Sequence, residues 1–268
     1  MRKFAAFLML LGLSGCGAAV EEPVQETAAE MVIPPEPGDA VAQFTEAIDN
    51  DPQDEKAFRE RGNAYFNQGE LELAVDDYSE SLKLKPDAKT YYNRGCAYSG
   101  LNELDKANED FDEASRLDPK DPAPYFNRGI NFYKKGDAAR AIQDLTEAMR
   151  LDPRDPQGPL NRGLAYSKKG QANLDLALRD LTEAIRLAPR DPQAYNNRGT
   201  VHGAKGNHQS AVADFSRAIE LDHDLASAYR NRGNAYLQLG DTDKAGGDFK
   251  TALKFEPGQI DNIPPQYR

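Results

Sequence analysis

Tryptophan is absent from this 268-residue chain, and only two cysteines and three histidines occur in it. So few cysteines argue against a fold held together by disulfide bonds, as small cysteine-rich domains are. Basic residues are also in deficit, because 33 lysines and arginines face 44 aspartates and glutamates, for a formal net charge of −11. Such a chain repels polyanions. We therefore expect no nucleic-acid partner and no membrane contact through a basic surface.

Long apolar runs are scarce as well. One run, residues 4–13, is too short to span a bilayer comfortably. Arg2 and Lys3 precede it, and small residues follow it, which is typical of a secretory signal covering residues 1–15. The sequence therefore predicts export rather than a transmembrane helix.

The apolar run ends in Leu13-Ser14-Gly15-Cys16, which resembles the lipobox of bacterial lipoproteins. The resemblance implies cleavage before Cys16 and covalent lipid on that cysteine, with no other cofactor expected. With Gly17 next, it also implies a periplasm-facing protein on the outer membrane more than on the inner one. An ordinary secretory signal with an incidental cysteine is the alternative.

Residues 16–38 carry the lipid site and then an acidic stretch rich in proline and alanine, which predicts a tether. If Cys16 carries lipid, the chain offers no second thiol for an intramolecular disulfide. Cys96 is then most simply a small side chain that is buried or lines a groove.

A regular repeat dominates the rest of the chain. The dipeptide Arg-Gly recurs at intervals of 33–36 residues. Its glycines are Gly62, Gly95, Gly129, Gly163, Gly199 and Gly233. A period of this length indicates one supersecondary unit copied end to end, which stacks to bury a core and exposes long surfaces.

Each repeat predicts a hairpin of two helices. If the glycine is position 8, an aromatic residue stands at position 4 in five repeats, alanine at position 20 in all six, and a large apolar residue at position 24. These spacings form one helical stripe, and the small residues let two helices approach closely. A Gly-Asp, Gly-Glu or Gly-Asn turn separates the helices in most repeats, and Asp-Pro ends most of them.

The pattern resembles the tetratricopeptide repeat closely, which implies an all-α fold, a solenoid of helical hairpins. The array is expected over residues 39–258, with a tail at 259–268. Residues 39–52 match only a second helix, so they predict an N-terminal half-repeat. The six full repeats are expected at residues 55–87, 88–121, 122–155, 156–191, 192–225 and 226–258.

Two departures from the pattern bear on the array. Pro159 replaces the aromatic residue of the fourth repeat, which predicts a shortened helix beginning at that proline. No helix is expected after Pro257, so the last apolar face is expected to be covered either by the tail or by a partner.

No catalytic or metal site is expected. His202, His208 and His223 are spaced six and fifteen residues apart, which does not place them on one helical face. The chain contains no phosphate-binding loop, metalloprotease motif or nucleophile elbow. The sequence therefore predicts a protein that is not an enzyme.

The arginine of each Arg-Gly has an expected partner. Position 23, on the facing helix, is aspartate in all six repeats. We expect a structural arginine–aspartate ladder inside the array. Its members are Arg61, Arg94, Arg128, Arg162, Arg198 and Arg232, with Asp77, Asp110, Asp144, Asp180, Asp214 and Asp248.

Position 6 is the candidate ligand-binding position, because the family resemblance implies that it faces the concave groove. Amides can donate to and accept from the backbone of an extended peptide. The candidates are Asn93, Asn127, Asn161, Asn197 and Asn231. Tyr92, Phe126 and Tyr133 are expected as apolar groove residues, with packing between adjacent repeats as the alternative role.

The sequence thus predicts a membrane-anchored, non-catalytic scaffold that binds a protein or extended peptide of unknown identity, in envelope assembly or regulation. The chain would touch the membrane through its lipid alone. A chaperone-like holder of exported unfolded chains is the alternative.

Overall fold

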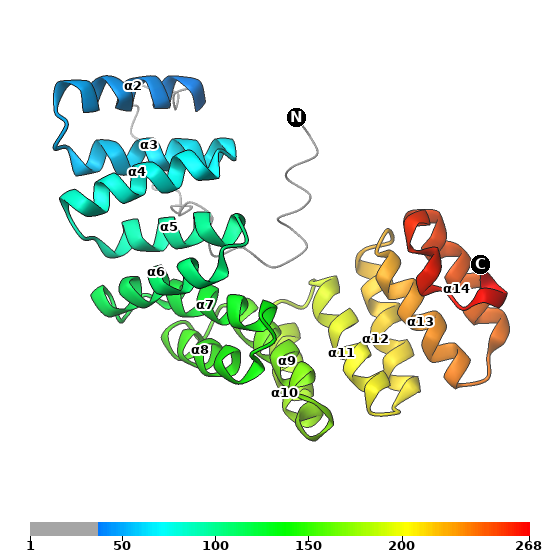
Figure 1. The fold of residues 1–268 in the computed structure, drawn as a ribbon. Coiled ribbons are helices and arrows are strands. Elements are labelled where there is room, and N and C mark those ends of the chain that lie inside the picture. The colour runs from blue at the N-terminus through cyan, green and yellow to red at the C-terminus, as the bar shows by residue number, and fades with distance from the viewer. Residues whose placement is uncertain (1–36) are drawn as a thin grey trace, which may run out of the picture. The chain divides into compact units, whose positions relative to one another are not determined.

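The computed structural model describes residues 37–268, which are helical apart from turns and short connections (Figure 1). The expected signal peptide, Cys16 and nearly all of the expected tether lie outside these described residues. No strand occurs within residues 37–268.

The described helices alternate as the repeat predicts. The first helices of the hairpins are α3 (Glu55–Gln68), α5 (Ala88–Gly100), α7 (Pro122–Lys134), α9 (Gln157–Lys169), α11 (Pro192–Ala204) and α13 (Ala226–Gln238). The second helices are α4 (Leu71–Leu84), α6 (Leu104–Leu117), α8 (Ala138–Leu151), α10 (Leu174–Leu187), α12 (His208–Leu221) and α14 (Thr242–Phe255). One more helix, α2 (Pro37–Asn50), precedes them and packs against α3 as a half-repeat would.

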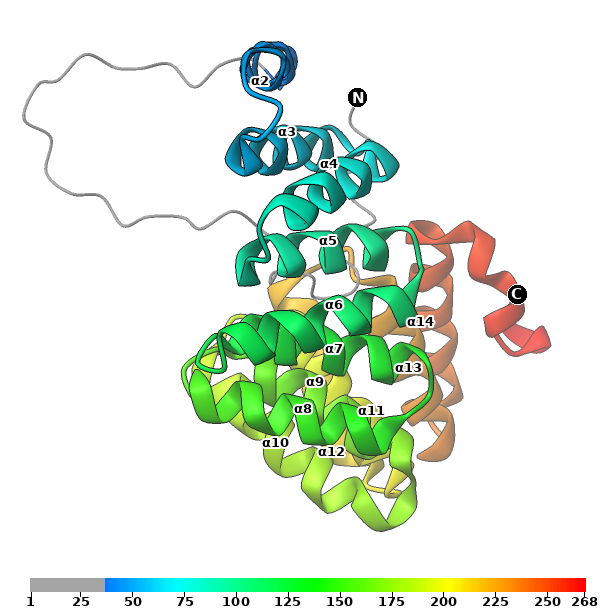
Figure 2. The same ribbon diagram turned by 60° about the vertical axis from the view of Figure 1, so that its left-hand side comes forward.

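The chain forms two compact units whose boundary lies within α7. The N-terminal unit ends at Asn131, and the C-terminal unit comprises Phe132–Arg268. In the N-terminal unit, α2 packs against α3, α3 against α4, α4 against α5 and α5 against α6 (Figure 2). In the C-terminal unit, the helices from α8 to α14 pack in the same sequential way.

The repeated glycine is required by close contact between the two helices of a hairpin. A Cβ atom on Gly95 would lie 2.7 Å from the ring of Phe111, the position-24 residue of the same repeat. Gly199 stands in the same relation to Phe215, also at 2.7 Å. Phe111 is fully buried, so its ring cannot move away. A larger residue in place of either glycine would push the helices apart.

The arginine–aspartate ladder joins the two helices of a hairpin. Arg94 donates to Asp110 through Nε and Nη2 at 2.8 and 2.7 Å, and the carboxylate is buried. The same two-bond geometry joins Arg61 to Asp77, Arg162 to Asp180, Arg198 to Asp214 and Arg232 to Asp248. The hydrogen bond to Asp77 raises the pKa of Arg61. Arg128 and Asp144 belong to different units, so their pairing stays a prediction.

Each ladder arginine also contacts the preceding repeat, a contact that was not predicted from the sequence. Nη1 of Arg94 donates to the Ser79 hydroxyl at 3.0 Å, across the junction of two hairpins. Equivalent contacts join Arg61 to Thr45, Arg128 to Asp112, Arg162 to Thr146, Arg198 to Thr182 and Arg232 to Ser216. A polar residue recurs at position 25 with the repeat period, and this signal could have revealed the contact.

The fourth repeat accommodates its departures without a shorter helix. Pro159 is the third residue of α9, which begins at Gln157 and has 13 residues, as α11 does. Its missing N–H falls among the first four of a helix, which have no intrahelical partner. The prediction of a shortened helix is therefore wrong. The two extra residues fall in the turn after α9, where a 3₁₀ segment (Gln171–Asn173) leads into α10.

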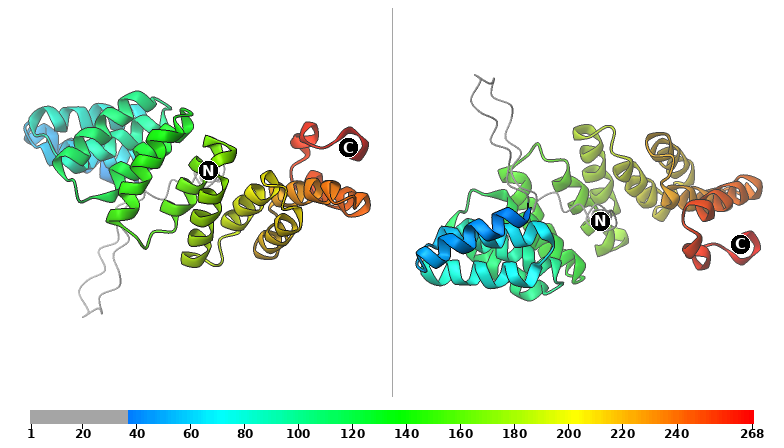
Figure 3. Two further views of the ribbon diagram at one scale, coloured as in Figure 1. Left: turned by 90° about the horizontal axis from the view of Figure 1, so that it is seen from below. Right: turned by 90° about the horizontal axis from the view of Figure 1, so that it is seen from above.

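The C-terminal tail covers the last hairpin. It forms two 3₁₀ turns, η3 (Pro257–Asn262) and η4 (Pro265–Tyr267), which contact α14 (Figure 3). Ile263 is buried against Ala245 and Phe249, and the Tyr267 ring lies 5.2 Å from that of Phe249. The prediction that no helix follows Pro257 is therefore wrong, and the tail itself covers the apolar face.

Candidate functional site

Two of the five candidate asparagines are used inside the fold. Asn127 is 3% exposed, and its Nδ2 donates to the Tyr92 hydroxyl at 3.0 Å and to the Ala123 carbonyl at 3.1 Å. Asn161 is also buried, and its Nδ2 donates to the Gln157 carbonyl one turn earlier. Hydrogen bonds within the fold therefore occupy the side-chain amide nitrogens of both residues.

Asn93 and Asn231 instead join the first helices of neighbouring hairpins. Asn93 on α5 donates to Asn63 on α3 at 2.9 Å, and Asn231 on α13 donates to Asn196 on α11 at 3.1 Å. Both are half-buried, as is Asn197 on α11. These three candidates lie at least partly open to solvent, on the first helices.

The candidate aromatic residues differ in their exposure. Phe126 is only 5% exposed, so it acts as a core side chain in the structure, as the packing alternative expects. Tyr92 is half-buried with its ring 5.9 Å from that of Phe111, and burial raises the pKa of its hydroxyl. Tyr133 is also half-buried, and the Lys168 ammonium lies 4.5 Å from its ring centre. Of the three, Phe126 offers almost no surface to a ligand.

A cavity that was not predicted from the sequence opens in the C-terminal unit between α11, α12 and α13. Its volume is about 470 Å³. Its lining residues are Thr200, Gly203, His208, Phe215, Asn231, Asn234, Ala235 and Gln238. This set combines amides, a hydroxyl and an imidazole with an apolar surface from Phe215 and Ala235. No carboxylate, lysine or arginine lines the cavity, so it suits a neutral group.

Gly203 opens this cavity. It occupies position 12 of the fifth repeat, where the first and third repeats have Phe66 and Tyr133. A Cβ atom on Gly203 would meet nothing within 4 Å. Close packing therefore does not require a glycine at position 203, whereas it does at Gly199 one turn earlier. Glycine at position 12, where two other repeats hold an aromatic ring, was the sequence signal for the cavity.

The three histidines have different surroundings in the structure. His202 on α11 places Nε2 3.9 Å from Asp214, while its buried Nδ1 has no hydrogen-bond partner. His208 lines the cavity, and His223 is exposed in a turn. Within residues 37–268, no three histidine, cysteine, aspartate or glutamate side chains are grouped so that they could hold a metal ion.

The same part of the chain contains no helix with the length and apolar character needed to cross a bilayer.

Solved structures of other proteins resemble this chain. YrrB, described as a tetratricopeptide repeat protein with an unusual peptide-binding site, is 25% identical; the match covers 70% of this chain and 97% of YrrB, with a TM-score of 0.61. MamA from Desulfovibrio magneticus RS-1 is 23% identical over 64% of this chain and 96% of its own, with a TM-score of 0.59. A protein from Parabacteroides merdae is 20% identical over 85% and 91%, with a TM-score of 0.66. The last two likenesses show the fold alone. A search of curated proteins found no match.

Family models identify the repeat itself. Models of the tetratricopeptide repeat match residues 55–87, 88–121, 123–155 and 226–259, and a further model of the repeat matches 203–240. Together these ranges cover more than half of the chain. Pro159 and the inserted turn lie between them. The chain belongs to the tetratricopeptide repeat family, and its fold is the α-solenoid of that family.

Proposed function

We propose that this protein is a membrane-anchored, non-catalytic adaptor that binds an extended segment of a partner protein in the cell envelope. Tetratricopeptide arrays generally bind proteins or peptides, and YrrB is a relative described as having a peptide-binding site. The anchor is the lipid expected on Cys16, and the envelope location follows from the lipobox resemblance. The observation that carries the binding proposal is the cavity between α11 and α13.

The cavity suits one side chain of such a segment, together with its backbone. Asn231 donates to Asn196, and its Oδ1 makes no hydrogen bond among the described residues, so it can accept from a peptide N–H. Asn234 and Gln238 are exposed beside it on α13 and can donate or accept. Phe215 and Ala235 supply apolar contact for the aliphatic part of the bound side chain. We therefore assign a neutral polar or small apolar side chain to this cavity.

The test uses a photo-crosslinking amino acid at Asn234, which lines the cavity, in intact cells. The matched control places it at Lys250, an exposed residue of α14 outside the cavity lining. We expect one defined crosslinked protein from position 234 and none from position 250. Many crosslinked chains from position 234 would favour the chaperone-like holder instead.

A second variant keeps the test independent of folding. Gly203→Tyr fills the cavity with the residue that the third repeat has at this position, and the open space around Gly203 accommodates it. Crosslinking from position 234 should fall at least fivefold, while the melting temperature stays within a few degrees. Undiminished crosslinking with the cavity filled would contradict the proposal.

A further inference from the structure

One buried asparagine holds two of the residues that line the cavity at Gly203. Asn196 on α11 is 6% exposed, and its Oδ1 accepts from Asn231 Nδ2 at 3.1 Å. Its backbone carbonyl accepts from the Thr200 hydroxyl at 3.0 Å. Asn231 and Thr200 both line the cavity, whereas Asn196 is not among the lining residues. Asn196 therefore acts on the site through these two neighbours.

These two bonds determine which hydrogen-bonding atoms the lining residues still offer. A threonine hydroxyl has one hydrogen to donate, and that of Thr200 goes to Asn196, so its Oγ1 remains as an acceptor. The bond from Asn231 to Asn196 fixes the orientation of the Asn231 amide, whose Oδ1 makes no hydrogen bond among the described residues. The cavity lining thus presents two oxygen acceptors.

The residue that creates this arrangement is particular to the fifth repeat. Asn196 occupies position 5, where the other repeats have Arg59, Tyr92, Phe126, Leu160 and Arg230. The repeat pattern does not require an asparagine at this position, so its presence beside the cavity needs another explanation.

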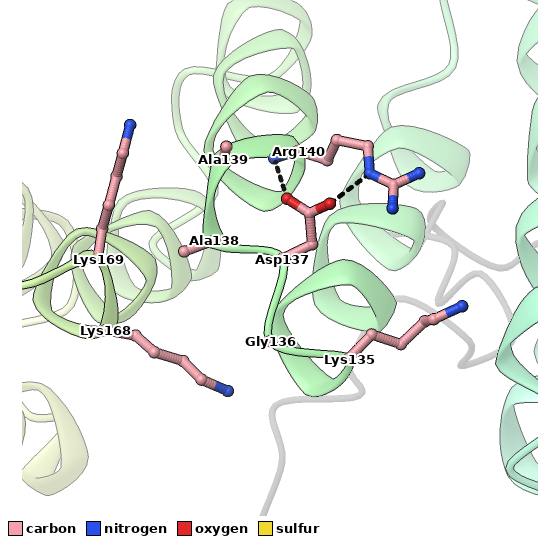
Figure 4. A pocket seen from close by; sticks show the side chains of 8 residues that line it. All are labelled: Lys135, Gly136, Asp137, Ala138, Ala139, Arg140, Lys168 and Lys169. Atoms are coloured by element: carbon pink, nitrogen blue, oxygen red, sulfur yellow. Dashed lines mark hydrogen bonds and ion pairs between the residues drawn. The ribbon is translucent and has the colours of Figure 1, made fainter.

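The lack of charge in the lining narrows the class of ligand further. No carboxylate, lysine or arginine is among the lining residues of this cavity, so nothing there offsets the cost of burying a charged group. Another cavity of the C-terminal unit, of about 590 Å³, shows the contrast, because Lys168, Lys169 and the ion pair of Asp137 with Arg140 lie along it (Figure 4). The cavity at Gly203 therefore favours a neutral group that donates hydrogen bonds.

We infer that the cavity binds the side-chain carboxamide of an asparagine or glutamine in the partner segment, and that Asn196 is the positioning residue for this preference. A carboxamide carries two N–H donors, one for each of the oxygens of Asn231 and Thr200. Its carbonyl can accept from the amide of Asn234 or Gln238, which are exposed in the cavity lining. A serine or threonine hydroxyl has one hydrogen and leaves one oxygen without a donor. The inference rests on the proposed function, because it takes the same cavity as the binding site.

The experiment titrates the isotope-labelled full chain with two small probes and follows the side-chain amide signals of Asn231 and Asn234 by NMR. One probe is N-acetylglutamine N-methylamide, and the other is the corresponding glutamate derivative with its γ-carboxyl group as the methyl ester. Both have the same length and the same carbonyl, but the ester lacks the side-chain N–H groups. We expect the glutamine probe to bind about tenfold more tightly, because the ester forms neither bond to the two oxygens. Equal affinities, or signals that neither probe changes, would overturn the inference.

Variants of Asn196 test its positioning role. Asn196→Leu removes the acceptor that holds Asn231, so the preference for the glutamine probe should fall to about threefold, since only the threonine oxygen stays oriented. Asn196→Asp keeps an oxygen at this place and should retain the preference. The control Asn63→Leu removes the similar contact with Asn93 in the N-terminal unit and should also retain it. If the buried carboxylate prevents folding, the comparison of the two leucine variants is sufficient. An undiminished preference in Asn196→Leu would show that Asn196 positions nothing.

The cavity-filling variant locates the probe and separates this inference from the proposed function. Gly203→Tyr should abolish binding of the glutamine probe, and unchanged binding would overturn the inference. One defined crosslinked protein from position 234 together with equal probe affinities would overturn the carboxamide assignment alone. Selective binding of the glutamine probe without any crosslinked protein would overturn the proposed function alone.

Discussion

Arg94 and Ser79 connect two neighbouring hairpins, because Nη1 of the arginine donates to the serine hydroxyl at 3.0 Å. Nε and Nη2 of the same guanidinium donate to Asp110 within its own hairpin. One side chain therefore joins the two helices of a repeat and also joins that repeat to its neighbour.

Removing one member of the ladder leaves the other charge buried without its partner. Asp110→Leu or Arg94→Leu alone should each lower the free energy of unfolding by about 3 kcal/mol. The double variant should recover at least half of that loss. Urea unfolding followed by circular dichroism measures all three. As a control, Arg116→Ala removes an exposed pair with Glu113 and should leave the free energy of unfolding nearly unchanged, because solvent screens this pair. Losses that simply add in the double variant would contradict the pairing.

The contact between repeats can be tested separately. Ser79→Ala removes an acceptor of Arg94 while leaving Asp110 in place, and it should cost about 1 kcal/mol. Ser79→Thr keeps the hydroxyl and should cost less. The same urea measurement compares the two, and an equal loss would show that the hydroxyl contributes nothing at this junction.

The tail contributes to the stability of the last hairpin. Ile263 is 2% exposed, so Ile263→Ala should lower the free energy of unfolding by about 2–4 kcal/mol through lost burial and a cavity. Ile260 lies in the same tail but is 43% exposed, and Ile260→Ala should have little effect. Hydrogen exchange of the α14 amides reports the same difference locally. Unchanged exchange in Ile263→Ala would contradict a covering role for the tail.

His202 makes stability depend on pH. Burial lowers its pKa, while the nearby Asp214 opposes the shift and Arg198 and Lys205 reinforce it. The unfolded chain therefore binds the proton more readily than the folded chain. The free energy of unfolding is highest above the ordinary histidine pKa of about 6.5 and decreases as the pH drops below it.

The variant His202→Tyr tests this effect. It places at position 202 the residue that the next repeat has there, Tyr236. The variant should gain melting temperature relative to the parent as the pH is lowered from about 7.5 to about 5.5. His223→Gln, at an exposed histidine, serves as the control. A gain in His202→Tyr that is the same at every pH would show that protonation has no part in it.

The lipid expected on Cys16 has a direct test. Cells fed a radiolabelled fatty acid should label the parent protein and leave Cys16→Ala unlabelled. Removal of Cys96 should leave labelling unchanged. Label that persists in Cys16→Ala would contradict the anchor.

The fold could be predicted because its determinants repeat. Gly95 against Phe111 and Arg94 against Asp110 occur at fixed spacings, so one sequence shows the same contact several times. The contacts at position 25 are equally periodic. They involve serine, threonine or aspartate, so no single residue type recurs there to mark them in the sequence.

The candidate site was harder to predict, because exposure depends on packing between repeats rather than on position within one. Asn127 and Asn231 share a repeat position, yet Asn127 is buried against Tyr92 while Asn231 lines a cavity. That cavity depends on the missing side chain at Gly203. Its signal in the sequence is a glycine at position 12 that no other repeat shares, so the repeated pattern does not reveal it.

The tail also occupies one surface of the last hairpin. A Cβ atom on Gly246 would lie 3.3 Å from the Tyr267 ring, so the small residue on α14 lets that ring settle on the helix. Ile263 and Tyr267 thus occupy the surface that a seventh hairpin would need. Grafting another repeat after Phe255 would therefore first require removal of these two side chains.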